Sequence, residues 1–154
     1  MYMSKQKLLI EQIDRKLSTL KHVKKLIIPQ KGWISTIRTA LKMSMRQLGN
    51  RLNMSAQGVK DIEKREANGS MSINSLREVA NALDMKLVYG FIPKDDSVKK
   101  MIERRAIKIA QEIVMRTSNT MKLEDQQNSK RRINKAIKSK AEEIKNKMPK
   151  YLWD

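Results

Sequence analysis

The chain has 154 residues, enough for one ordinary domain or for a small domain with helical extensions. Its 34 Lys and Arg against 16 Asp and Glu give a formal net charge of +18, an excess that repels itself unless a polyanion or an acidic protein binds it. The chain holds no cysteine and one histidine, which excludes disulfides and thiolate metal sites. We therefore expect no cofactor and no metal site, and nucleic acid is the leading candidate partner.

The sequence also argues against a membrane or secreted protein. No stretch approaches the about 18 apolar residues that a membrane span needs. The N-terminal residues lack the apolar core of a secretory signal, because lysines and an acid interrupt them. Together with the absence of cysteine, this predicts a cytoplasmic protein that does not bind membranes.

Residues 1–30 form the first predicted region. Leu9, Ile13 and Leu17 recur at helical spacing, which predicts an amphipathic helix over residues 5–25 that ends near Pro29. The sequence assigns this helix no role.

Residues 31–93 form the second predicted region. Apolar periodicity predicts four compact helices between Trp33 and about Asp84. Residues 85–92 then show an alternating side-chain pattern and are rich in β-preferring residues. This predicts a short strand that ends at Pro93.

Residues 94–154 form a predicted C-terminal helical region. Ser97 is expected to cap a helix that runs to about Thr117, and a lysine-rich helix follows over residues 129–147. The chain ends in an apolar tag, residues 149–154, which is able to dock on another surface. The expected fold is therefore mainly α, with one short β-strand and with helical extensions at both ends.

The centre of the chain holds two short helical patterns, each opened by a serine. Ser44 and Gln47 have the Ser-x-x-Gln spacing of a capping box, and Ser55 caps the next helix. Asn53 tolerates the left-handed conformation that ends a helix, and Gly49 is small enough for the two helices to approach closely. Two short helices joined by a tight turn predict a helix-turn-helix, whose second helix lies in the DNA major groove.

The second helix of this pair has an outward face suited to DNA. Only Val59 and Ile62 are expected to face the core. Of the outward residues, Gln57 can make two hydrogen bonds to adenine, Lys60 can reach guanine or a phosphate, and Ala56 fits beside a thymine methyl group.

Arg46 and Gln47, at the start of the first helix, face the place where the sugar-phosphate backbone would cross. The alternative is an αα-hairpin, a plain pair of antiparallel helices with a solvated polar face. That alternative does not require serine caps, a small glycine and a one-sided basic surface together, so we favour DNA binding. The predicted DNA-binding residues are Arg46, Gln47, Ser55, Ala56, Gln57, Lys60, Asp61 and Lys64.

One short recognition helix buries too little surface for specific affinity, so we expect a homodimer on two half-sites of double-stranded DNA. Either the strand or the N-terminal helix is able to form the dimer. A non-specific nucleic-acid or RNA-binding protein is less favoured, because aromatic residues, which stack on bases, are only 4% of the chain and no RNA-binding signature is present. No catalytic constellation is evident, and we do not expect an enzyme.

Residues 33–92 resemble the Cro/phage-repressor (Xre-like) helix-turn-helix family through the Gln-Leu-Gly to Ile-Glu pattern of residues 47–63. Nearly the whole chain resembles the mobile mystery protein A family. The resemblance lies in KGWISTIRTALKMS at 31–44, EKREANGSMSINSLREVANALDMKLVYGFIP at 63–93, TMKLEDQ at 120–127 with one added Gln, and LWD at 152–154. The chain differs from the family in being unusually lysine-rich and in carrying Asn53 where glycine is more typical.

The closer resemblance implies a protein encoded beside a Fic-domain toxin. It implies an antitoxin that binds and inhibits this toxin and represses its own operon through the helix-turn-helix. A stand-alone Xre-like transcriptional regulator is the alternative.

Thr120 and Glu124 resemble the inhibitory motif of Fic enzymes, in which a glutamate pairs with the arginine that would hold the γ-phosphate of ATP. Asp125 stands where that motif has Gly or Asn. Ser139 and Glu143 have the same spacing, and the position in the family favours Thr120 and Glu124. An ordinary solvated helix start is the other interpretation of these residues.

We expect Glu124→Gly to release toxicity in cells that co-express the Fic partner, because the inhibitory carboxylate is lost. Colony counts after induction measure this effect. Unaltered protection by Glu124→Gly would remove Glu124 from the mechanism.

Overall fold

The computed structural model describes residues 4–118 and 126–154, and all regular secondary structure within these residues is helical. The mainly α fold is therefore confirmed. The chain forms two compact units. We call residues 25–90 the central unit, and residues 1–24 together with 91–154 the hairpin unit. None of the described helices is long and apolar enough to cross a membrane.

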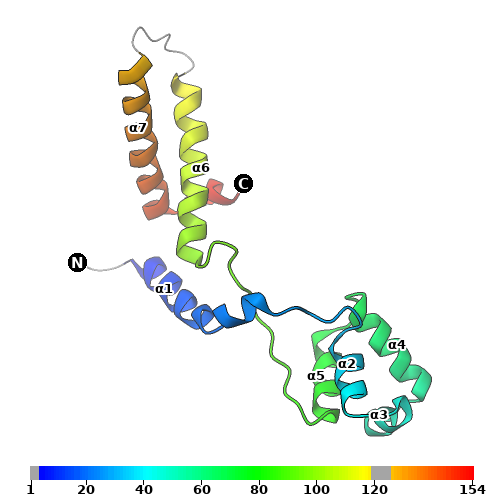
Figure 1. Ribbon diagram of the computed structural model, residues 1–154. Coiled ribbons are helices and arrows are strands. Elements are labelled where there is room, and N and C mark those ends of the chain that lie inside the picture. The colour runs from blue at the N-terminus through cyan, green and yellow to red at the C-terminus, as the bar shows by residue number, and fades with distance from the viewer. Residues whose placement is uncertain (1–3, 119–125) are drawn as a thin grey trace. The chain divides into compact units, whose positions relative to one another are not determined.

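The central unit consists of α2 (Trp33–Ala40), α3 (Met45–Leu52), α4 (Ala56–Ala67) and α5 (Ile73–Ala82), which form a small bundle (Figure 1). The four compact helices predicted for this region are confirmed. Each helix buries the apolar residues that recur along one of its faces, because burying such a face is the main source of stability for short helices. The buried apolar residues of this unit are Ile34, Leu48, Val59, Ile62, Val79 and Leu83.

The short strand predicted over residues 85–92 is wrong, since this segment has no regular secondary structure. A strand requires a neighbouring strand to receive its backbone hydrogen bonds, and the described part of the chain offers none. Val88 and Phe91 are 71% and 84% exposed, so the alternation does not bury one face. The β-preferring side chains favour an extended backbone locally, but this preference does not make a strand without a neighbouring strand to pair with.

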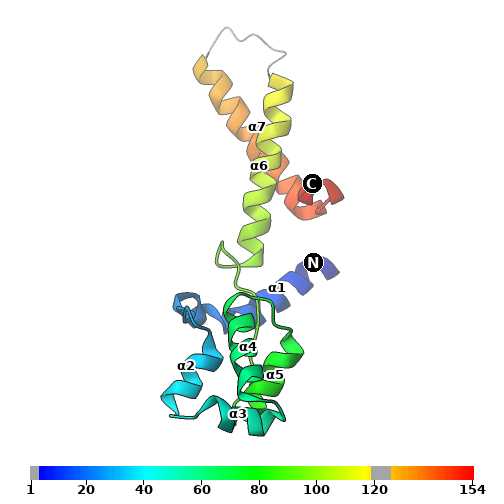
Figure 2. The ribbon, with the colours of Figure 1, turned by 90° about the vertical axis from the view of Figure 1, so that its right-hand side faces the viewer.

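The hairpin unit consists of α1 (Lys5–Ser18), α6 (Val98–Ser118), α7 (Gln126–Lys147) and a final 3-10 turn, η2 (Lys150–Trp153). α6 and α7 lie side by side and run in opposite directions (Figures 1 and 2). Ala106 and Ala110 of α6 and Ala141 of α7 are buried in the core that the two helices share. The buried residues of this unit are Ile102, Ala106, Ile109, Ala110, Ala141, Ile144 and Leu152.

The N-terminal helix is shorter than predicted. α1 ends at Ser18, and a 3-10 turn, η1 (Lys21–Lys25), follows it. The hydroxyl of Ser18 donates to the Arg15 carbonyl at 2.7 Å, and the hydroxyl of Thr19 donates to the Lys16 carbonyl at 2.8 Å. These side-chain bonds compete with continuation of the helix.

α1 holds the start of α6. The carboxylate of Asp14 accepts the backbone N–H of Val98 at 2.6 Å and that of Lys99 at 3.1 Å. Ser97 caps the same turn by accepting the N–H of Lys100 at 3.1 Å. A negative charge at a helix N-terminus is favourable because it satisfies N–H groups that have no partner within the helix. The N-terminal helix therefore has a structural role that the sequence did not indicate.

The apolar C-terminal tag docks on its own chain. Leu152 is fully buried against α6. Arg105 of α6 donates to the carbonyl of Leu152 at 2.7 Å and also to the carbonyl of Asp154. Tyr151 and Trp153 remain 44% and 53% exposed.

Candidate nucleic-acid interface

α3 begins at a complete capping box. The hydroxyl of Ser44 accepts the N–H of Gln47 at 3.1 Å, and the side-chain oxygen of Gln47 accepts the N–H of Ser44 at 2.8 Å. At its other end, Asn53 has φ 53° and ψ 43°, the left-handed conformation expected for it. Ser55 then caps α4 by accepting the N–H of Gly58 at 3.0 Å. The predicted caps and the tight turn between α3 and α4 are confirmed.

Gly49 is required by the turn that follows α3. A Cβ atom at this position would lie 2.5 Å from the carbonyl oxygen of Met54, closer than such atoms approach in proteins. The close approach predicted at Gly49 is therefore present, and it is made with the backbone of the turn.

The inner face of α4 is held to α2 by a buried ion pair. Glu63 is 8% exposed and, among the described residues, is the only charged residue that is buried. Nε of Arg38 donates to Oε1 of Glu63 at 2.5 Å, and Nη2 donates to Oε2 at 3.3 Å. Arg38 also donates to the carbonyl of Met43 at 2.9 Å. The hydrogen bond to Glu63 raises the pKa of Arg38, and burial partly opposes this effect.

A second carboxylate of α4 caps the start of α2. The two oxygens of Glu66 accept the backbone N–H groups of Trp33 and Ile34 at 2.8 and 2.9 Å. Gly32, at the N-cap of α2, has φ 82° and no side chain with which to cap the helix itself. A Cβ atom on Gly32 would lie 2.7 Å from the Glu66 carboxylate. Because Glu63 and Glu66 lie on one face of α4, they fix which face of this helix points away from the unit.

The residues predicted to bind DNA are all exposed. Arg46 and Gln47 lie in the first turn of α3, and the others lie at the N-cap and along α4. The amide nitrogen of Gln57 donates to the carboxylate of Asp61 at 3.0 Å, so these two side chains lie together along α4. This bond favours one orientation of the Gln57 amide. The exposed residues are Arg46, Gln47, Ser55, Ala56, Gln57, Lys60, Asp61 and Lys64.

The proposed toxin-inhibitory pair, Thr120 and Glu124, lies outside the described residues. The alternative pair at the same spacing is Ser139 and Glu143 of α7. Glu143 already forms ion pairs with Lys140 at 3.1 Å and with Lys147 at 2.9 Å. Hydrogen bonds from these lysines, that of Lys147 first, lower the pKa of Glu143.

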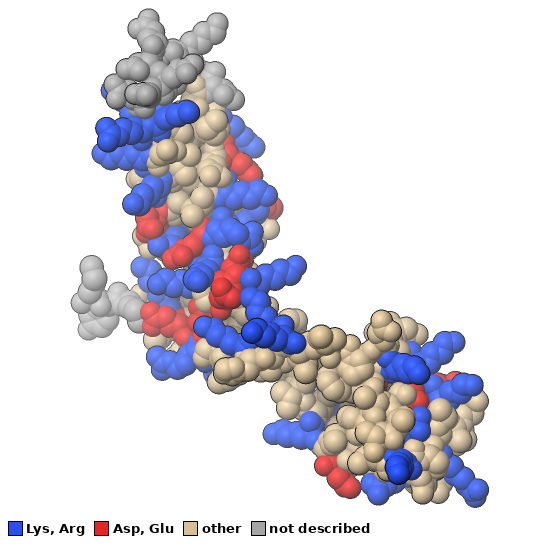
Figure 3. Space-filling model, in the orientation of Figure 1, with Lys and Arg blue, Asp and Glu red and all other residues tan. Residues whose placement is uncertain are grey.

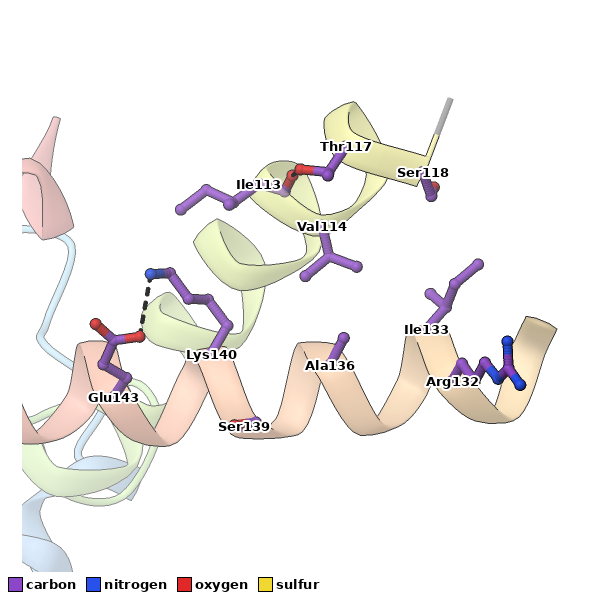
Figure 4. Close-up of a pocket in the computed structure, with 10 residues that line it drawn as sticks. All are labelled: Ile113, Val114, Thr117, Ser118, Arg132, Ile133, Ala136, Ser139, Lys140 and Glu143. Carbon is purple, nitrogen blue, oxygen red and sulfur yellow. Dashed lines mark hydrogen bonds and ion pairs between the residues drawn. The ribbon is translucent and has the colours of Figure 1, made fainter. Parts of the chain in front are cut away.

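A groove of about 580 Å³ runs between α6 and α7 (Figure 4). Val114 of α6 and Ile133 and Ala136 of α7 project into it, so its walls are largely apolar. Its charged residues stand at its edges, and the ion pair of Lys140 with Glu143 is among them. Within residues 4–118 and 126–154, no group of three potential metal ligands is present.

No family model matches this chain, and comparisons with curated proteins and with solved structures find no significant match. The resemblance to the mobile mystery protein A family stays a prediction from the sequence. The geometry of α3 and α4 is therefore the basis for a function.

The ion pair of Arg38 with Glu63 gives a testable prediction about the central unit. Arg38→Ala leaves a buried carboxylate without its partner, and we expect it to lower the free energy of unfolding by about 3 kcal/mol. The double variant Arg38→Met/Glu63→Leu removes both charges and is expected to recover most of this loss.

Urea unfolding followed by the fluorescence of Trp33 in a Trp153→Phe background measures the central unit. Arg77→Ala, an exposed arginine on α5, is the control and is expected to change stability by about 0.5 kcal/mol at most. Unfolding of Arg38→Ala at the same urea concentration as the parent would contradict a structural role for the pair.

Proposed function

We propose that this chain binds double-stranded DNA through α3 and α4 as a helix-turn-helix, with α4 in the major groove. The observation that carries this proposal is the orientation of α4. Glu63 and Glu66 fasten its inner face to α2, while Gln57, Lys60 and Lys64 project from its outer part into solvent. A rigidly held helix with exposed polar side chains near its N-terminus suits insertion into the major groove.

The bond of Gln57 with Asp61 favours base recognition. An amide nitrogen has two protons, and Asp61 accepts only one of them. The second proton and the amide oxygen of Gln57 remain available for the N7 and N6 groups of adenine. In this proposal Asp61 positions Gln57 and does not itself contact DNA bases.

The start of α3 suits a phosphate. The oxygen of the Gln47 side chain is used in the capping box, so its amide nitrogen is left to donate to a phosphate oxygen. Arg46 is exposed beside it, and the positive end of the helix dipole adds to the attraction.

We propose that the protein acts as a homodimer, since one recognition helix provides too little contact area for specific binding. The outer face of α1 supports this proposal. Leu8, Leu9 and Ile13 are 45%, 42% and 45% exposed there, and a second copy of α1 is able to cover them.

Replacement of Lys60 tests the DNA interface. If Lys60 reads a base, we expect Lys60→Ala to weaken operator binding by roughly 5- to 150-fold and to change the sequence preference. If it contacts only a phosphate, binding should weaken evenly for all sequences, and the salt slope should fall by about one.

Fluorescence anisotropy with labelled promoter DNA at two salt concentrations measures both outcomes. Lys86→Ala, an exposed lysine outside α3 and α4, is the matched control. Equal affinity of Lys60→Ala and the parent at both salt concentrations would argue against this position for α4.

We further propose, on the resemblance stated above, that the chain is the antitoxin of a Fic-domain toxin and represses its own operon. A stand-alone Xre-like regulator without an inhibitory role is the alternative. The two proposals share the α4 interface and differ only in the protein partner.

Co-purification of the chain with the product of its neighbouring gene, followed by titration of the operon promoter, separates them. We expect stable association and sequence-specific promoter binding for an antitoxin. Promoter binding without association would leave the stand-alone regulator, and association without promoter binding would contradict autorepression.

A further inference from the structure

The two halves of α7 carry their charge in different ways. In the C-terminal half, lysines are neutralised by nearby acids. Lys140 pairs with Glu143 at 3.1 Å, Lys145 with Glu142 at 2.8 Å, and Lys147 with Glu143 at 2.9 Å. In residues 130–139 no acid is present.

None of the cations of this N-terminal half forms an ion pair with a described residue. They are Lys130, Arg131, Arg132, Lys135 and Lys138, and all of them are exposed. The charge of Lys138 does act on Glu142, whose pKa is lowered first by the hydrogen bond of Lys145 and to a smaller extent by Lys138. Figure 3 shows mostly Lys and Arg (blue) at the upper end of the hairpin on the face drawn. Asp and Glu (red) lie mostly farther down.

This arrangement works against the helix that carries it. Like charges three or four residues apart destabilise a helix, and Lys135 has Arg131 and Lys138 at these distances. A helix that only needed a solvated surface would mix both signs, as the C-terminal half of α7 does. The unbalanced half is therefore better explained by a ligand that carries negative charge.

Three of these cations share one face. Arg131, Lys135 and Lys138 are four and three residues apart, so they form a row about 10 Å long along the helix. We call this row the α7 stripe. Arg132 instead lines the groove of Figure 4, and Lys138 borders a separate hollow that includes Ile107 of α6.

We propose that the α7 stripe binds the phosphate backbone of double-stranded nucleic acid, without reading its sequence. Duplex DNA carries one negative charge per about 1.7 Å of axis, so a 10 Å row of cations faces several phosphates at once. The stripe includes no aromatic side chain for stacking on bases.

An acidic protein is the other kind of polyanion. The core of a protein–protein interface is depleted of lysine, and two of the three stripe residues are lysines. The biological use of the stripe rests on the proposed function, whereas its binding to DNA is testable without it.

Titration of the full chain against a labelled duplex of scrambled sequence, between about 50 and 200 mM salt, tests the stripe. We expect the triple variant Arg131→Gln/Lys135→Gln/Lys138→Gln to bind roughly tenfold or more weakly at the lower salt concentration. We also expect its plot of log affinity against log salt to be less steep by about 2 to 3, because three phosphate contacts are lost. Unchanged affinity and slope would overturn the proposal.

The matched control is Lys5→Gln/Arg15→Gln/Lys16→Gln, which removes the same charge from exposed residues of α1. An equal change of slope in this control would show that only the overall charge matters, and would overturn the proposal. The variant Arg131→Lys/Lys135→Arg/Lys138→Arg keeps every charge and is expected to bind like the parent. Circular dichroism should show that all three variants keep their helix content, because none of these side chains is buried.

Two further measurements separate this proposal from others: a comparison of the triple variant with Lys60→Ala, and a titration with poly-glutamate. If Lys60→Ala loses operator binding and the triple variant binds DNA normally, the stripe proposal fails and the proposed function stands. If only the triple variant weakens DNA binding, the α4 interface fails and the stripe stands. If the triple variant loses binding to poly-glutamate but keeps binding to the duplex, the ligand is an acidic protein and the proposal is overturned.

Discussion

The ion pair of Arg38 with Glu63 is the constraint on which the central unit depends. A carboxylate buried to this extent is tolerated only with a partner, so α2 and α4 pack in the one arrangement that brings the two groups together. Such a pair contributes little net stability compared with an apolar pair, but it determines how α4 is turned about its axis. The choice of residues that α4 exposes follows from this buried contact.

The hairpin unit is organised by the same kind of contact. A helix start needs acceptors for its free N–H groups, and in both units an acid from another helix supplies them. Glu66 of α4 caps α2, and Asp14 of α1 caps α6. Each contact joins one helix to the N-terminus of another. It therefore fixes the position of the two helices and also provides acceptors for the free backbone N–H groups. The short helices of the central unit depend on tertiary contacts of this kind.

Local features of this chain could be predicted from the sequence, whereas long-range polar contacts could not. Three features depend only on neighbours a few residues away: the capping box of Ser44, the left-handed backbone conformation of Asn53, and the close approach of the chain at Gly49. Arg38 and Glu63 are 25 residues apart, and nothing in their spacing indicates a pair. The strand over residues 85–92 failed because strand formation depends on a partner that local preference does not reveal. The exposure of the predicted DNA-binding residues agrees with the proposal, and DNA binding itself stays a prediction.

The order of the units along the chain has a consequence for synthesis on the ribosome. The central unit is one continuous segment, residues 25–90, inserted between the two parts of the hairpin unit. It can complete its core as soon as those residues have emerged. α1 is made first, but Asp14 meets Val98, 84 residues later, and Leu152 enters the same core later still. The nascent chain therefore folds its middle before its beginning has a partner, and Asp14 of α1 has no helix start to cap until α6 follows.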